Sequence, residues 1–492
     1  AAAPRAGSPA APVPGSTQSL RLDAVSADRS TDHAATAGLS RQKVKPFSLV
    51  GVVWNDKKAH LDGTVQVRTR RVGSTAWTGW QSVETRNDDH APDPGTAEAE
   101  SSAVRGSTAP LWVGDSDAVQ VRVRTKAPAG STRAAAPALP KGLRLDLVDP
   151  GPDPQPTDPQ PTDPTAADPT AADPTAADPT AADPTVADPQ PADSTAADPT
   201  AADPTAADPT AADPQPADPT AADPTAADPT AADPAAADPT SAHPTSADPT
   251  AADASTPGSE SAAQAAPTEL PALSKEATVA ELEQSGAKAG PYVAPRPRIV
   301  TRKGWGADES VRESAFLYTD TVKVAFVHHT ATGNNYTCAE APSLLRGIYR
   351  YHVKSLGWRD IGYNFVIDKC GTIYEGRAGG VTKPVMGAHT LGFNTDSTGV
   401  AVLGTFTSAE PPAPAVTALS RFTAWKLGLT GADPAGKTTL VSDGGNRYEK
   451  GTEAKLNVIS GHRDGFATEC PGAKLYDKLG AIRSAAARYQ GR

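Results

Sequence analysis

A five-residue repeat of the form Thr-Ala-Ala-Asp-Pro dominates the middle of the chain. Aspartate recurs at every fifth position from Asp153 to Asp253, and only His243 interrupts the series. Proline removes backbone donors and disfavours helix at the preceding residue, and large apolar side chains are almost absent, so no core can form. A period of five is also too short for stacked solenoid units. We therefore predict an extended low-complexity linker over residues 151–255.

The linker hides a basic charge in the rest of the protein. The formal net charge is −11, and removing the 20 aspartates of residues 151–254, which contain no Lys, Arg or Glu, leaves +9. A basic surface attracts anionic wall polymers through long-range fields, although solubility alone explains the charge equally well. Nucleic acid is a poorer candidate, because no clustered Lys/Arg helix or aromatic stacking motif is present. The aspartates lack the glycines and varied oxygen ligands of calcium loops, which disfavours calcium binding.

The start of the chain and its cysteines favour an extracellular protein. The sequence begins Ala-Ala-Ala-Pro and has a single methionine, as expected after signal-peptide cleavage, although a chain trimmed by design would look the same. The sequence contains no apolar run of about 18 residues, so we predict no transmembrane segment. We expect a secreted or cell-wall-associated protein in which Cys338 and Cys370 form a disulfide and Cys470 remains free. Three unconnected buried thiols are the alternative.

Residues 20–150 have the pattern of an all-β domain, after a segment over residues 1–19 that we expect to be disordered. Apolar and polar residues alternate over 47–54, 65–71, 77–83, 118–124 and 143–148, with Gly, Asp and Asn turns between them. This pattern predicts a small sandwich or jelly roll of unknown ligand. Trp77, Trp80 and Trp112 are expected in its core, in preference to a sugar-stacking surface.

Residues 295–492 have the pattern of an α/β domain, and a short connecting segment over 256–294, with a helix near 278–284, leads into it. Strands are predicted over 322–327, 363–368, 372–375, 399–406 and 456–459, and helices over 341–356, 416–427 and 474–489. The alternation of strands and helices predicts a central mixed sheet flanked by helices.

Two motifs in this domain indicate an open metal site. His328 follows the apolar strand 322–327 in Val-His-His-Thr-Ala, and His462 and Cys470 belong to Gly-His-Arg-Asp-x-x-x-Thr-Glu-Cys-Pro-Gly. Two imidazoles and a thiolate leave one position of a tetrahedral zinc for water. His329 is an alternative to His328, but neighbouring strand residues point to opposite faces, so only one is expected to face the metal. Considered alone, two histidines and a cysteine this far apart in sequence are more often buried structural residues than metal ligands.

Six motifs in order make residues of about 297–490 resemble the peptidoglycan recognition protein family, which is related to type-2 N-acetylmuramoyl-L-alanine amidases. They are Trp-Gly-Ala-Asp-Glu from Trp305, the two histidine motifs, Gly-Trp-Arg-Asp-Ile-Gly-Tyr-Asn-Phe from Gly357, Tyr-Glu-Gly-Arg from Tyr374 and Gly-Ala-His-Thr-x-Gly-x-Asn from Gly387. The layout of the whole chain is similar to that of secreted actinobacterial amidases such as those of Streptomyces.

The resemblance implies a role for each matched residue. It makes His328, His462 and Cys470 the Zn²⁺ ligands and places Tyr363 and Thr468 beside the reaction, although some relatives carry lysine at the position of Thr468. It also implies that the muropeptide contacts His352, Trp358, His389 and Asn394. Ala378-Gly379 replaces a Gly-Trp pair of relatives that favour diaminopimelate stems, which leaves the stem preference open.

The expected activity is zinc-dependent hydrolysis of the amide between N-acetylmuramic acid and L-alanine in peptidoglycan. The alternatives are a non-catalytic peptidoglycan receptor and a structural wall protein. Cys470 favours the enzyme, because non-catalytic relatives usually lose this ligand.

Overall fold

The structure, a computed structural model, describes residues 15–24, 35–41, 43–126, 138–153 and 267–492. The predicted linker lies outside these ranges after Asp153. The expectation of disorder over residues 1–19 is wrong at its end, because Ser16–Arg21 forms β1 and pairs along its length with β9, Arg144–Asp149. The hydrogen bonds of that ladder hold the start of the described chain in the sheet.

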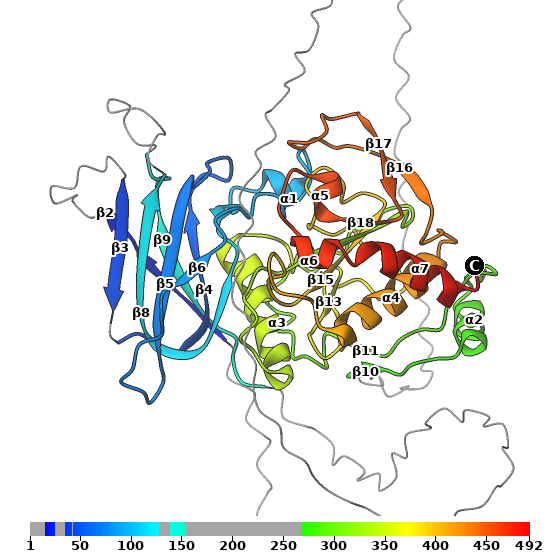
Figure 1. Ribbon diagram of the computed structural model, residues 1–492, viewed down its shortest axis with the longest axis horizontal. Coiled ribbons are helices and arrows are strands. Elements are labelled where there is room, and N and C mark those ends of the chain that lie inside the picture. The colour runs from blue at the N-terminus through cyan, green and yellow to red at the C-terminus, as the bar shows by residue number, and fades with distance from the viewer. Residues whose placement is uncertain (1–14, 25–34, 42, 127–137, 154–266) are drawn as a thin grey trace, which may run out of the picture. The chain divides into compact units, whose positions relative to one another are not determined.

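A nine-stranded antiparallel sheet, curved on itself, forms the β-domain (Figure 1). Its other strands are β2 Asp23–Ala24, β3 Thr36–Arg41, β4 Phe47–Trp54, β5 Gly63–Arg71, β6 Gln81–Val83, β7 Gly106–Ser107 and β8 Leu111–Thr125. The long strand β8 pairs with β3, β4 and β5 and so joins the two halves of the sheet. The all-β prediction is confirmed, and the sheet encloses an apolar core that contains Val50, Val65, Val121 and Leu145.

The three tryptophans differ in burial. Trp112 is buried, but in a cluster shared with the α/β-domain and not in the core of the β-domain where it was predicted. The core prediction is wrong for Trp77 and Trp80, which are half-buried. The Arg122 guanidinium lies 4.2 Å from the Trp80 ring centroid, and Arg68 lies over both rings. A guanidinium stacked on an indole covers the ring without placing it in the core.

A seven-stranded mixed sheet forms the second domain, in the order β10-β11-β14-β13-β15-β12-β18. These strands are β10 Glu269–Leu270, β11 Ile299–Val300, β12 Val324–His329, β13 Phe365–Ile367, β14 Ile373–Glu375, β15 Ser397–Val402 and β18 Ile459–Gly461, and a separate hairpin contains β16 Lys437–Val441 and β17 Glu453–Asn457. The predicted boundary at residue 295 is therefore too late, because β10 already pairs with β11.

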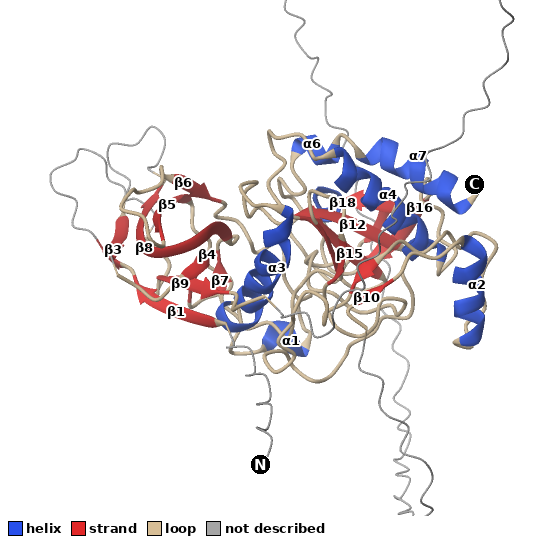
Figure 2. Ribbon diagram, turned by 90° about the horizontal axis from the view of Figure 1, so that it is seen from below, coloured by secondary structure: helices blue, strands red, loops and turns tan. Residues whose placement is uncertain are grey.

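Helices cover both faces of this sheet (Figure 2). The helices in the described part of the chain are α1 Ala97–Glu100, α2 Lys275–Gln284, η1 Cys338–Glu340, α3 Ala341–Arg350, the π-helical turn η2 Tyr351–Ser355, α4 Ala413–Gly428, α5 His462–Gly465, α6 Ala473–Tyr476 and α7 Leu479–Gln490. α4 and α7 pack on one face of the sheet through Phe422, Trp425 and Ile482. α3 packs on the opposite face, and so the predicted central mixed sheet flanked by helices is confirmed.

The β-domain and the α/β-domain share a buried apolar cluster. Leu49, Trp112 and Val148 of the first pack with α3 and with Trp305 of the second. Both faces of β4 are consequently buried, which explains its nearly continuous apolar sequence. In the described ranges, no helix has the length and apolar character needed to cross a membrane.

Candidate metal centre

Parallel pairing of β12 with β18 brings His328 and His462 together. Val327 lies opposite Gly461 in this pair, so the next residue on each strand is a histidine of the predicted site. The carboxyl ends of parallel strands meet at one edge of a sheet, which is where open α/β folds place their sites. His328 is therefore within β12, one residue beyond the predicted strand, and His462 begins α5.

Cys470 completes the cluster from the loop after α5. His328 Nδ1 lies 3.2 Å from His462 Nδ1 and 3.7 Å from Cys470 Sγ. Zinc bonds of about 2.0–2.1 Å to nitrogen and 2.3 Å to sulfur, at tetrahedral angles, separate two nitrogens by about 3.3 Å and a nitrogen from a sulfur by about 3.6 Å. The three buried side chains therefore have the spacing of ligands around one ion.

The protonation of these groups suits a metal ion. Burial, reinforced by His462 and other nearby imidazoles, holds the pKa of His328 well below its ordinary value. Burial and His90 likewise lower the pKa of His462 to about 3, so both rings are neutral and have a lone pair to donate. Burial raises the pKa of the Cys470 thiol, and only a nearby cation supplies the charge that favours its thiolate.

His329 lies outside the cluster, although it is also buried. Its Nδ1 accepts a hydrogen bond of 3.2 Å from the backbone N–H of Phe406. The alternation of side chains along β12 separates it from His328, as the sequence suggested.

His90, on the loop after β6, reaches the same cluster, and it was not predicted as a site residue. The ligand atoms of His90, His328, His462 and Cys470 all lie within 4.8 Å of one another. His90 belongs to no recognised motif and is far from the other three in sequence. The one sequence pattern that could have indicated a ligand here is the Asp-Asp-His run that begins at Asp88, in a region predicted to connect two strands.

Tyr363 and Thr468, the residues expected beside the reaction, both lie next to the cluster. The ring centroid of Tyr363 is 5.7 Å from that of His328. Burial, with added contributions from Cys470 and Asp89, raises the pKa of Tyr363 well above its ordinary value, so its hydroxyl is a donor. Thr468 donates to the carboxylate of Asp89 and accepts a hydrogen bond from the backbone N–H of Cys470.

The four residues expected to contact substrate are buried, and two of them lie against the metal cluster or the β-domain. His352 stacks on Trp358 with 4.5 Å between ring centroids and accepts a hydrogen bond from the N–H of Gly362. His389 lies 3.2 Å from His328 Nε2, and its own Nε2 has no partner. Asn394 donates to Asp93 of the β-domain.

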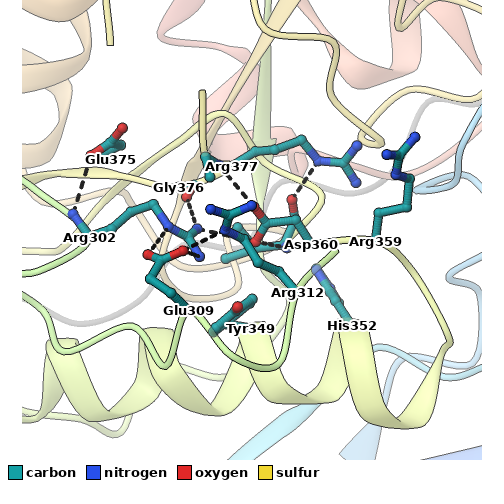
Figure 3. A network of polar contacts seen from close by, with 12 residues as sticks. Arg302, Glu309, Arg312, Tyr349, His352, Arg359, Asp360, Glu375, Gly376 and Arg377 are labelled. Carbon is teal, nitrogen blue, oxygen red and sulfur yellow. Dashed lines mark hydrogen bonds and ion pairs between the residues drawn. The ribbon is translucent and has the colours of Figure 1, made fainter. Parts of the chain in front are cut away.

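An ionic network around the buried Arg302 connects three segments near the cluster. The Arg302 guanidinium lies between Glu309 and Asp360, and it also donates to the carbonyl of Gly376 (Figure 3). The other carboxylate oxygen of Asp360 accepts from the N–H of Ala378. These contacts hold the backbone of Gly376 and Ala378, the residues on either side of Arg377.

The predicted disulfide between Cys338 and Cys370 is present, and Cys470 is the free cysteine. The disulfide ties the start of η1 to the turn between β13 and β14. Neither Cys338 nor Cys370 belongs to the cluster of possible metal ligands.

Comparison with known proteins shows two matched regions. Residues 318–473 match the family described as N-acetylmuramoyl-L-alanine amidase, and residues 4–179 match the family described as Rv3811 N-terminal galactose-binding domain-like. Peptidoglycan-recognition protein SC2 of Drosophila simulans is 32% identical over 181 residues, which are 37% of this chain and 84% of that protein. The N-acetylmuramoyl-L-alanine amidase of Homo sapiens is 32% identical over 187 residues, covering 37% of this chain and 28% of that protein. The solved structure of wild-type Drosophila PGRP-LB is similar over 37% of this chain and 93% of its own, with 26% identity and a TM-score of 0.30.

Proposed function

We propose that this chain, which belongs to the peptidoglycan recognition protein family, is a zinc-dependent N-acetylmuramoyl-L-alanine amidase. It would hydrolyse the amide between N-acetylmuramic acid and L-alanine of the peptidoglycan stem. The observation that carries the proposal is the buried set of His328, His462 and Cys470, spaced as ligands of one ion. The matched amidase family and the human amidase support hydrolysis in preference to binding alone.

The donor set fits zinc better than a hard cation. Imidazole nitrogen and thiolate sulfur are typical zinc ligands, whereas Mg²⁺ and Ca²⁺ prefer oxygen. When bound to three protein ligands, zinc lowers the pKa of a coordinated water to about 7 and polarises a carbonyl.

Tyr363 and Thr468 have separate roles in this proposal. The protonated Tyr363 hydroxyl, close to His328, is suited to donate to the oxyanion that forms when the amide carbonyl is attacked. Thr468 acts on Cys470 through the backbone N–H and is a positioning residue. His352 and Trp358, stacked on each other, would form one wall of the substrate site.

Metal binding by single variants distinguishes His328 from His329. We expect His328→Ala to lose bound zinc after dialysis, because a ligand is removed. His329→Gln should retain it, because the glutamine oxygen can still accept from the N–H of Phe406. Metal analysis of both purified variants checks this, and equal zinc loss from the two would contradict the assignment of His328.

Mass analysis of digested muropeptides tests the activity. The zinc-loaded full chain should release free stem peptides that begin with L-alanine and leave the sugar intact, and a chelator-treated sample should release none. Intact muropeptides after treatment with every zinc-loaded form of the chain, including His90→Ala, would instead support a peptidoglycan receptor.

A further inference from the structure

We propose that His90 of the β-domain is a fourth protein ligand of the metal centre, and that it closes the site against water and substrate. This proposal rests on the proposed zinc amidase and specifies how it is regulated. An amidase centre with three protein ligands needs its fourth position for water. In this structure an imidazole from another domain takes that position, so the chain is folded in a latent form.

The position of His90 is that of a ligand. Its Nε2 lies 3.7 Å from Cys470 Sγ, the same distance that separates Cys470 Sγ from His328 Nδ1. The His90 ring packs edge-on against His462, with 4.5 Å between centroids. All four groups are buried, and together they offer four protein ligands, the number that fills a tetrahedral zinc and leaves no position for water.

Asp89 holds the His90 ring in the orientation that a ligand needs. An Asp89 carboxylate oxygen lies 2.8 Å from His90 Nδ1. When Nδ1–H donates to this oxygen, Nε2 carries no proton, and it is Nε2 that faces Cys470 Sγ. Carboxylate–histidine pairs of this kind commonly orient metal-ligating histidines. The other carboxylate oxygen accepts from Thr468, so Asp89 also connects the His90 loop to the Cys470 loop.

The 84–105 segment, which connects β6 to β7 and contains α1, fastens His90 to the α/β-domain. In Figures 1 and 2, α1 lies against that domain. Asp93 accepts hydrogen bonds from the backbone N–H groups of Gly392 and Asn394, and from the Asn394 side chain. Glu98 forms a buried ion pair with Arg377 and accepts from the N–H of Arg359.

These contacts cover the side of the site where substrate is expected. The family resemblance places Asn394 in contact with substrate. Its side-chain amide nitrogen instead donates hydrogen bonds to the carbonyl of Ala91 and the carboxylate of Asp93. The N–H of Leu391, in the same motif, donates to the carbonyl of Asp89. A muropeptide would have to displace the 84–105 segment to reach these groups, so opening the site requires both His90 and the segment to leave.

Cobalt spectroscopy of the full chain tests whether His90 is a ligand. Co²⁺ added to the metal-free wild type should give the visible absorption of a four-coordinate Cys-His₃ centre, and His90→Ala should change that spectrum because water replaces an imidazole. Loss of a ligand should weaken zinc binding at least about tenfold, as measured by chelator competition. His60→Ala is the matched control, since His60 is an exposed histidine of the same domain. It should leave both values unchanged.

Activity supplies a second readout. Release of stem peptides by zinc-loaded His90→Ala should exceed that by wild type at least about tenfold, because the competent state is no longer a small fraction of the chains. Unchanged cobalt spectra and zinc affinity would overturn the proposal, as would a lower activity of His90→Ala. X-ray absorption of the zinc-loaded wild type reports the ligands of the metal without any variant. A set of one sulfur, two imidazoles and one oxygen, instead of one sulfur and three imidazoles, would also overturn the proposal for His90. If neither wild type nor His90→Ala releases stem peptides, the proposed amidase activity is contradicted. The cobalt spectra still decide whether His90 is a ligand.

Discussion

Replacing Cys470 by alanine is expected to remove bound zinc and with it the release of stem peptides. The thiolate is the only anionic member of the Cys-His₃ set, and its loss leaves three neutral imidazoles around a dication. Loss of the metal should cost several kcal/mol of transition-state stabilisation, or about 10²–10⁴-fold in rate. Zinc content by metal analysis and stem-peptide release by mass spectrometry, measured on the same preparation, check both parts of the expectation.

The background chosen for this variant matters because the proposed fourth ligand, His90, would keep the folded chain latent. Cys470→Ala should be compared with unmodified Cys470 in a chain that also carries His90→Ala, where the starting rate is high enough to show a large fall. His329→Gln in the same background is a suitable control, because it changes a buried histidine next to the cluster without removing a ligand. Full activity of the Cys470→Ala chain without metal would exclude the zinc mechanism.

The sequence predicted the α/β-domain well because the constraints there are local. Strands such as 324–329 and helices such as 413–428 are marked by apolar periodicity, and the motifs fix which strand ends meet. The π-helical turn after α3 was predicted as a continuation of the helix. Apolar spacing changes little between an α-helix and one wider turn, so periodicity could not separate them.

Three of the four proposed metal ligands could be predicted from the sequence, and the fourth could not. His328, His462 and Cys470 stand in motifs, whereas His90 comes from a loop of the other domain and depends on how the two domains pack. That packing is visible in the sequence only indirectly, as the nearly unbroken apolar run of β4 and as Trp112, whose burial is shared with α3. Contacts between domains leave no periodic pattern in the sequence, so the partners of Asp93 and Glu98 could not be predicted from the sequence alone.

Replacing Glu98 by glutamine is expected to loosen the 84–105 segment strongly. Glu98 and Arg377 have side-chain exposures of only 4% and 6%, and the glutamine would leave the Arg377 guanidinium buried beside a neutral group. Breaking a buried ion pair in this way costs about 3–5 kcal/mol. This cost applies to the docked state, in which the 84–105 segment packs on the α/β-domain. In the undocked state the segment has moved away and water hydrates the Arg377 guanidinium. Hydrogen exchange at the N–H groups of Gly392 and Asn394, which donate to Asp93, should quicken by about a hundredfold to a few thousandfold.

Glu100→Gln is the matched control, because Glu100 is in the same helix but exposed, and its ion pair with Lys57 should contribute at most about 1 kcal/mol. Protonation of Glu98 should remove the same contribution as the Glu98 variant. Burial alone would raise the pKa of Glu98, but the Arg377 guanidinium outweighs burial and holds it below the ordinary value of 4.5. The docked state therefore binds fewer protons than the undocked state, and its stabilisation by Glu98 is complete above about pH 4.5 and is lost as the pH falls through the lowered pKa. Exchange at Gly392 and Asn394 that is unaffected by Glu98→Gln would show that the ion pair does not hold the segment. Faster exchange together with faster stem-peptide release would show that the contact that stabilises the fold also keeps the enzyme closed.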